Sequence, residues 1–113
     1  MQTDQRRDLF PGALEMMILE TLRREPLHGY AIARHIRQRS EELLQVEEGT
    51  LYPALQRLLR EKWVQAEWGT SSRNRRVRIY RITAAGRKQL ERTVSSFEKM
   101  MQGIARVMRP AES

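Results

Sequence analysis

The stretch from Gly49 to Arg60 carries side chains that can form hydrogen bonds with phosphates and with the edges of bases. Leucines recur in it at the spacing of one buried helical stripe: Leu51, Leu55, Leu58 and Leu59. The other side offers a hydroxyl, a phenol, an amide and two guanidinium groups, from Thr50, Tyr52, Gln56, Arg57 and Arg60, together with Pro53. The major groove of DNA admits a helix equipped in this way. The alternative is an ordinary surface helix, since arginine and glutamine are common helix formers.

Positive charge is concentrated in one part of the chain. The 113 residues include 21 Lys and Arg against 14 Asp and Glu, which gives a formal net charge of +7. Between Thr70 and Arg92 there are eight Lys or Arg and the single acid Glu91. This balance favours a polyanionic partner, although a merely soluble basic protein would share it. The length predicts one domain with an appended helix.

Several classes of chemistry are disfavoured by what the sequence contains. There is no cysteine, which removes disulfides, thiolate metal sites and cysteine nucleophiles. The two histidines, His28 and His35, have no carboxylate at metal-ligand spacing, and no acid–base cluster or phosphate-binding glycine loop is present. We therefore expect no enzyme activity, no metal and no cofactor. No apolar run approaches the roughly 20 residues that span a bilayer, so a cytoplasmic, nucleoid-associated protein without a membrane partner is expected.

Three helices are expected in the first half of the chain. The first is predicted for Pro11–Arg24 and the second for Leu27–Ser40. The start of the third has two alternatives. If Thr50 caps it, Pro53 lies harmlessly in the first turn, but if it starts within Glu47–Glu48 the proline removes a hydrogen bond and bends it.

A β-hairpin is expected to follow the third helix. Trp63–Trp68 and Val77–Ile82 alternate with period two, and Gly69–Asn74 is rich in turn residues. The expected tip carries Arg73, Asn74, Arg75 and Arg76. Arginines there suit phosphates or a narrow minor groove, the alternative being a solvated loop. The predicted fold is mainly α with a two-stranded hairpin, an α+β winged helix-turn-helix domain over residues 1–83.

The last helix is expected to begin after the cap Thr83 and to end near Met108, within a dimerisation segment of residues 84–113. Apolar residues follow heptad spacing along it: Leu90, Val94, Phe97, Met101, Ile104 and Met108. About 25 residues rise about 37 Å, which exceeds what so small a core covers. We therefore expect the same helix of a second chain to pack on it, with Leu9 and Phe10 in the same interface. The alternative is a helix folded back on its own domain.

With these segments placed, the chain resembles the PadR family of bacterial transcriptional regulators, in the short-tailed branch with one C-terminal helix. The resemblance is carried by Pro26–Tyr30, by Gly49–Leu55, and by Trp68 through the basic turn to Arg87. The chain differs at Glu47–Glu48, where the family commonly has Ser-Pro, and two carboxylates would repel a phosphate there.

The resemblance implies a homodimer that represses by binding an operator, relieved in some members by a small aromatic or amphipathic effector. It also implies that Thr50, Tyr52 and Pro53 meet DNA and that Tyr30 lies near the DNA backbone. Phe97 is the only aromatic residue in the last helix, where some drug-binding relatives have a tryptophan.

Two copies of the third helix in successive major grooves predict an inverted-repeat operator. Arg57 or Arg60 would pair with guanine and Gln56 with adenine, while the wing arginines Arg73, Arg75 and Arg76 would meet phosphates or the minor groove. The alternatives are an architectural DNA binder without sequence preference and a winged-helix module that docks a protein partner.

Overall fold

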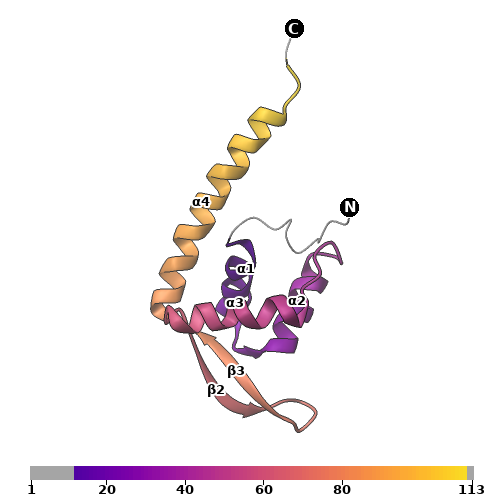
Figure 1. Cartoon of the computed structure of the whole chain (residues 1–113), viewed down its shortest axis with the longest axis vertical. Helices are drawn as coiled ribbons and strands as arrows, with labels where there is room; N and C mark the ends of the chain where they lie inside the picture. Colours follow the sequence, from indigo (N-terminus) through magenta and orange to yellow (C-terminus); the bar gives the residue numbers. More distant parts are fainter. Residues whose placement is uncertain (1–11, 112–113) are drawn as a thin grey trace.

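The computed structural model describes residues 12–111, and within that range the chain forms four helices and three strands (Figure 1). The helices are α1 (Ala13–Arg24), α2 (Gly29–Arg39), α3 (Glu48–Arg60) and α4 (Ala84–Met108), and the strands are β1 (Leu27–His28), β2 (Val64–Thr70) and β3 (Arg76–Ile82). In Figure 1 the first three helices gather at the base of the β2–β3 hairpin, and α4 projects away from them. The predicted order of three helices, a hairpin and a long last helix is confirmed.

The hairpin belongs to a small antiparallel sheet with the strand order β1-β3-β2. Leu27 and His28 were predicted to open the second helix, but they form β1 instead, with Leu27 opposite Tyr80, and α2 begins only at Gly29. The pairing gives hydrogen-bond partners to backbone groups on the edge of β3 that β2 leaves open. A strand of two residues is too short to show a period-two pattern, which is why the sequence did not reveal it.

The third helix begins at Glu48, with Glu47 at the N-cap, so the second of the two predicted starts is the observed one. Pro53 consequently lies inside α3. Its missing N–H would have been directed at the carbonyl of Gly49, four residues earlier. Gly49 is exposed, so water can bond that carbonyl in place of the proline.

The core lies between the helices and the base of the sheet. The predicted leucine stripe of α3 is buried, since Leu51, Leu55 and Leu58 expose at most 1% of their surface and Leu59 is half-buried. Residues from all four helices and the sheet complete the cluster: Leu14, Ile18, Leu19, Leu22, Ile32, Ala33, Ile36, Ala54, Val64, Tyr80, Ile82 and Leu90. One side of α3 is thereby committed to packing, and only the remaining side can meet a ligand.

The start of α4 is tied to the turn that joins α3 to β2. Thr83 is the N-cap, as predicted, and its Oγ1 accepts a hydrogen bond from the backbone N of Gly86 at 3.0 Å. The same hydroxyl donates to the carbonyl of Lys62 at 2.8 Å, and the backbone N of Thr83 donates to the carbonyl of Trp63 at 3.0 Å. These bonds fix where α4 leaves the winged-helix core.

Beyond its first turns α4 leaves the core. Leu90 is buried, Val94, Phe97 and Ile104 are half-buried, and Met101 and Met108 are exposed. The longest dimension of the molecule, 62 Å, runs along this projecting helix (Figure 1). Within the described residues, the far half of the heptad stripe therefore has no core beneath it. The division of the chain at residue 83 stays a prediction, and Gly86 and Leu90, just after it, are buried.

Candidate nucleic-acid interface

The outermost groups of α3 are those opposite its leucine stripe. Pro53, Gln56 and Arg60 are all exposed, and their spacing of three and four residues places them on one side of the helix. Thr50, one turn before Pro53, is half-buried. An amide and a guanidinium group on an exposed helix face can form paired hydrogen bonds with adenine and guanine edges.

The side chain of Tyr52 on α3 packs against the start of α2. A Cβ atom placed on Gly29 would lie 2.9 Å from the hydroxyl oxygen of Tyr52 and 3.0 Å from its ring, so glycine leaves the space that the phenol occupies. Tyr52 is 40% exposed, and burial raises its pKa above the ordinary value, with the Glu48 carboxylate and Tyr80 acting in the same direction. The side chain thus remains a neutral hydrogen-bond donor beside the polar face of α3.

The raised pKa of Tyr52 predicts how stability depends on alkaline pH. Tyr52 is protonated in both the folded and the unfolded state below the ordinary pKa of about 10, so its protonated phenol contributes fully to stability there. Above it the unfolded state loses the proton first, and stability falls as the pH rises through the higher folded pKa. We expect the alkaline decline in melting temperature between pH 9 and pH 11 to be smaller for Tyr52→Phe. Identical declines in the two proteins would contradict this cause.

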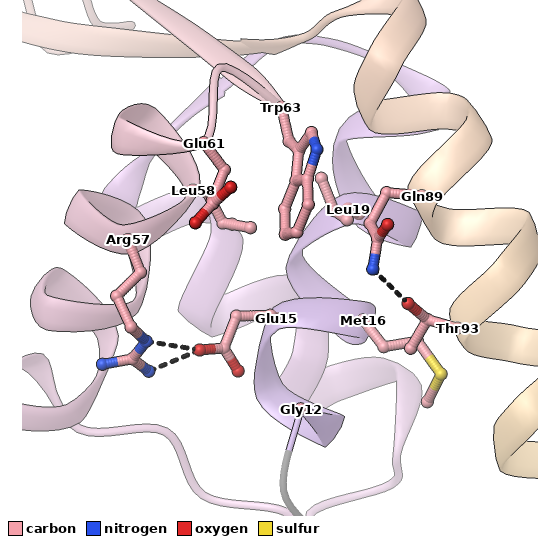
Figure 2. A pocket seen from close by; sticks show the side chains of 10 residues that line it. All are labelled: Gly12, Glu15, Met16, Leu19, Arg57, Leu58, Glu61, Trp63, Gln89 and Thr93. Carbon is pink, nitrogen blue, oxygen red and sulfur yellow. Dashed lines mark hydrogen bonds and ion pairs between the residues drawn. The ribbon is translucent and has the colours of Figure 1, made fainter.

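Arg57 points to α1 and away from the outermost face. Its Nε donates to Oε2 of Glu15 at 2.7 Å, and its Nη2 lies 2.5 Å from the same oxygen (Figure 2). Glu15 is only 20% exposed, whereas Arg57 is 49% exposed. The sequence placed Tyr52 and Arg57 together on one side of the helix, but the structure directs them to different neighbours, α2 and α1. Arg57 reaches a base only if it leaves Glu15.

A cavity of about 250 Å³ lies next to this ion pair, between α1, the end of α3 and α4 (Figure 2). Its lining consists of Gly12, Glu15, Met16, Leu19, Arg57, Leu58, Glu61, Trp63, Gln89 and Thr93. The indole of Trp63 projects between the helices, and Gln89 donates to Oγ1 of Thr93 at 3.1 Å on the α4 side. A molecule bound here would touch α3 and α4 at once.

The start of α2 and the tip of the wing form a second hollow, a cationic cleft of about 340 Å³. It is lined by His28, Tyr30, Arg34, Ser71, Ser72, Arg73, Arg75 and Val77. Tyr30 is 56% exposed, and the guanidinium carbon of Arg34 lies 5.7 Å from its ring centroid. The structure thus brings the predicted Tyr30 next to the predicted wing arginines. The sequence did not single out Arg34, although its spacing of four residues from Tyr30 was a signal.

The wing tip is shorter than predicted. The loop covers residues 71–75, so Arg76 lies in β3 opposite Thr70 and not at the tip. Asn74 has a φ of 62°, a left-handed conformation that asparagine tolerates better than most residues, and its N donates to the carbonyl of Ser71 at 2.9 Å. Asn74 therefore shapes the turn whether or not it also contacts DNA.

The strands of the wing carry two further arginines against an exposed aromatic ring. The guanidinium carbon of Arg76 lies 4.4 Å from the ring centroid of Trp68, and that of Arg78 lies 5.5 Å away. Trp68 is 57% exposed. The sequence had assigned Arg76 to the site, but neither Trp68 nor Arg78. Their alternation across the two strands was the available signal.

No group of three or more His, Cys, Asp or Glu side chains that could hold a metal ion occurs among residues 12–111. Between the same limits, no helix combines the length and the apolar character needed to cross a membrane. The predicted interface residues Leu9 and Phe10 lie outside the described residues.

Three helices packed on a basic hairpin, with the polar side of the third helix exposed, define a winged helix-turn-helix protein of the DNA-binding class. The family model described as the transcriptional regulator PadR-like family matches residues 18–92. The chain therefore belongs to the PadR-like family of transcriptional regulators, and the resemblance drawn from its motifs is confirmed.

Solved structures of similar proteins agree with this assignment, and a further relative is similar in sequence. A transcriptional regulator from Clostridium thermocellum has a TM-score of 0.82 and 28% identity, over 90% of this chain and 99% of that one. A PadR-like transcriptional regulator from Bacillus cereus has a TM-score of 0.75 and 27% identity, over 89% and 96%. An uncharacterised protein from Lysinibacillus sphaericus is 30% identical over 99 residues, 88% of this chain and 91% of its own length.

Proposed function

We propose that the chain is a cytoplasmic repressor that binds an inverted-repeat operator as a homodimer and blocks transcription by occupying a promoter. One observation carries the proposal. The exposed polar face of α3 lies in the same domain as a cationic cleft to which both α2 and the wing contribute, including Tyr30, Arg34, Arg73 and Arg75. A duplex can then be gripped by its phosphates while one helix reads its bases.

The roles within the interface follow from exposure. Gln56 and Arg60 are assigned to base contacts, because both are exposed opposite the leucine stripe. Glutamine pairs with adenine and arginine with guanine, so Gln56 is assigned to adenine and Arg60 to guanine. Arg57 takes a base contact only in a state that has lost its Glu15 partner. The start of α3 supplies Thr50, Tyr52 and Pro53, and the phosphate or minor-groove contacts come from Tyr30, Arg73, Asn74, Arg75 and Arg76.

Two substitutions separate base reading from phosphate binding. Gln56→Ala is expected to relax preference at one base pair, at a cost of roughly 1–3 kcal/mol for the preferred base only. Arg75→Gln is expected to weaken operator and random duplex alike and to lower the slope of log K against log salt by about 0.9. Fluorescence anisotropy with labelled duplexes, at several salt concentrations, measures both quantities.

The same titrations decide between the proposal and its rivals. An architectural DNA binder would have equal affinity for operator and random duplex, and Gln56→Ala would then change neither selectively. A protein-docking module would not retard promoter DNA at physiological salt. Footprinting of the DNA upstream of the protein's own gene locates the operator, and an asymmetric protected site would contradict the inverted repeat.

The proposed dimer rests on the long helix. Its heptad stripe, Leu90, Val94, Phe97, Met101, Ile104 and Met108, extends past the core of the protomer, where its last members are exposed or half-buried. A second α4 would cover it by coiled-coil packing. Two α3 helices would then be held at a fixed separation, as a palindromic operator requires.

We also propose that a small aromatic or amphipathic effector binds in the cavity beside Trp63 and thereby causes the protein to release its operator. Apolar side chains such as Met16, Leu19 and Trp63 contribute to the lining of the cavity. The cavity touches α3 through Arg57 and Leu58 and α4 through Gln89 and Thr93. A ligand that binds only the folded state adds about 2.7 kcal/mol to the free energy of unfolding at a concentration of 100 times its Kd. The melting temperature therefore rises. A screen of small aromatic compounds should yield at least one that raises the melting temperature and lowers operator affinity. Compounds that do only the former would refute release from this cavity.

A further inference from the structure

Trp68, Arg76 and Arg78 occupy one face of the wing. Trp68 lies opposite Arg78 in the β2–β3 register, and Arg76 is the next residue of β3 on the same face. The guanidinium carbons lie 4.4 Å and 5.5 Å from the centroid of the indole, both within cation–π range. One exposed ring therefore holds two cationic side chains that would otherwise be free to repel each other.

This face continues the one that packs on the helices. The residue pairs Val64–Ile82 and Ala66–Tyr80 precede Trp68–Arg78 in the register, and Val64, Tyr80 and Ile82 are buried in the core. The Trp68 group thus begins where the core ends, on the helix-facing side of the hairpin. Arg73 and Arg75 lie further out, at the loop, so the Trp68 group lies between the core and the basic tip of the wing that the proposed function assigns to DNA.

We propose that Trp68 is a positioning residue for DNA binding, which holds the Arg76 and Arg78 guanidinium groups ready for the sugar-phosphate backbone beside the groove that α3 enters. An indole that is 57% exposed contributes little to the core, so packing alone does not explain a tryptophan there. Long arginine side chains lose rotamer freedom when they bind, and a side chain already held in place loses less.

Double-mutant cycles measure the coupling between the ring and the arginines. Trp68→Leu keeps an apolar side chain but removes the aromatic face, and it leaves both charges in place. We expect operator affinity to fall about three- to tenfold with an unchanged salt slope, because the number of neutralised phosphates is the same. Trp68→Phe, which keeps a ring, should retain most of the affinity. Unchanged affinity in Trp68→Leu would overturn the proposal.

Measuring Trp68→Leu in two arginine variants shows whether its effect depends on Arg76 and Arg78. In Arg76→Gln/Arg78→Gln, the further change Trp68→Leu should have no effect, because the side chains that it positions are gone. In Arg75→Gln, which alters an arginine outside the ring contact, Trp68→Leu should retain its full effect. An equal effect in both backgrounds would show that Trp68 contacts DNA itself or acts only on folding, and would refute a positioning role.

A second variant set covers the case in which Trp68→Leu does not fold. Arg76→Lys/Arg78→Lys keeps both charges but loses the planar groups that stack on the indole. Its affinity should fall several-fold at an unchanged salt slope, and Arg75→Lys should fall less. Equal losses would overturn the proposal.

The inference rests on the proposed DNA binding, yet the two can fail separately. Phosphate contacts need no particular sequence, so the Trp68 cycle can also be measured on random duplex. Equal affinity for operator and random duplex would refute the proposed repressor function. Coupling between Trp68 and the two arginines on random duplex would still support the positioning role.

Discussion

An alanine at position 86 is expected to lower the free energy of unfolding by about 3 kcal/mol, at the upper end of the usual cost of overpacking. A Cβ atom on Gly86 would lie 2.1 Å from the carbonyl oxygen of Trp63 and 2.8 Å from Cγ1 of Ile82. The carbonyl cannot move aside cheaply, because it accepts a hydrogen bond from the backbone N of Thr83. Relief requires that α4 shift away from the turn between α3 and β2.

The measurement is thermal unfolding followed by circular dichroism, at one protein concentration for all variants. A loss of about 3 kcal/mol corresponds to a fall in melting temperature of about 12 °C or more for a domain of this size. Gly103→Ala is the matched control in the same helix, since nothing lies within 4 Å of its added Cβ. That variant should gain about 0.5–1 kcal/mol. A Gly86→Ala protein as stable as wild type would mean that the contact with Trp63 is not tight in solution.

The features that the sequence predicted correctly depend on short spacings. The leucine stripe from Leu51 to Leu58 and the cap Thr83 each follow from residues within one or two helical turns, and the structure agrees with both. Helix periodicity and capping depend on neighbouring residues, so they can be recognised from the sequence before the packing is known.

The features that the sequence missed depend on packing between distant segments. Arg57 pairs with Glu15, 42 residues earlier, and no local pattern distinguishes that partner from solvent or DNA. The phenol of Tyr52 occupies the space left by Gly29 in another helix. The site was thus predicted as a set of residues, whereas its division into outward, α1-facing and α2-facing groups required the fold.

The second large effect is expected from Ile104→Asp. Ile104 lies about 21 Å along α4 from Leu90, the last buried residue of the core, at a rise of about 1.5 Å per residue. A carboxylate there does not disturb the protomer core, but it would be buried without a partner if two α4 helices pair through the heptad stripe. We expect the variant to be monomeric at micromolar concentration by sedimentation velocity, with a melting temperature that no longer depends on protein concentration.

Loss of the dimer should reduce operator binding far more than binding to half an operator. Joining two binding modules multiplies affinity by about 10²–10⁴, so Ile104→Asp should bind the full inverted repeat at least about 100-fold more weakly and a single half-site almost as well as wild type. Gln102→Asp is the control, because Gln102 is exposed and off the stripe, and it should leave both affinities nearly unchanged. If a monomeric Ile104→Asp protein still bound the full operator tightly, one α3 helix and one wing would suffice for recognition, and the paired-helix arrangement would have to be abandoned.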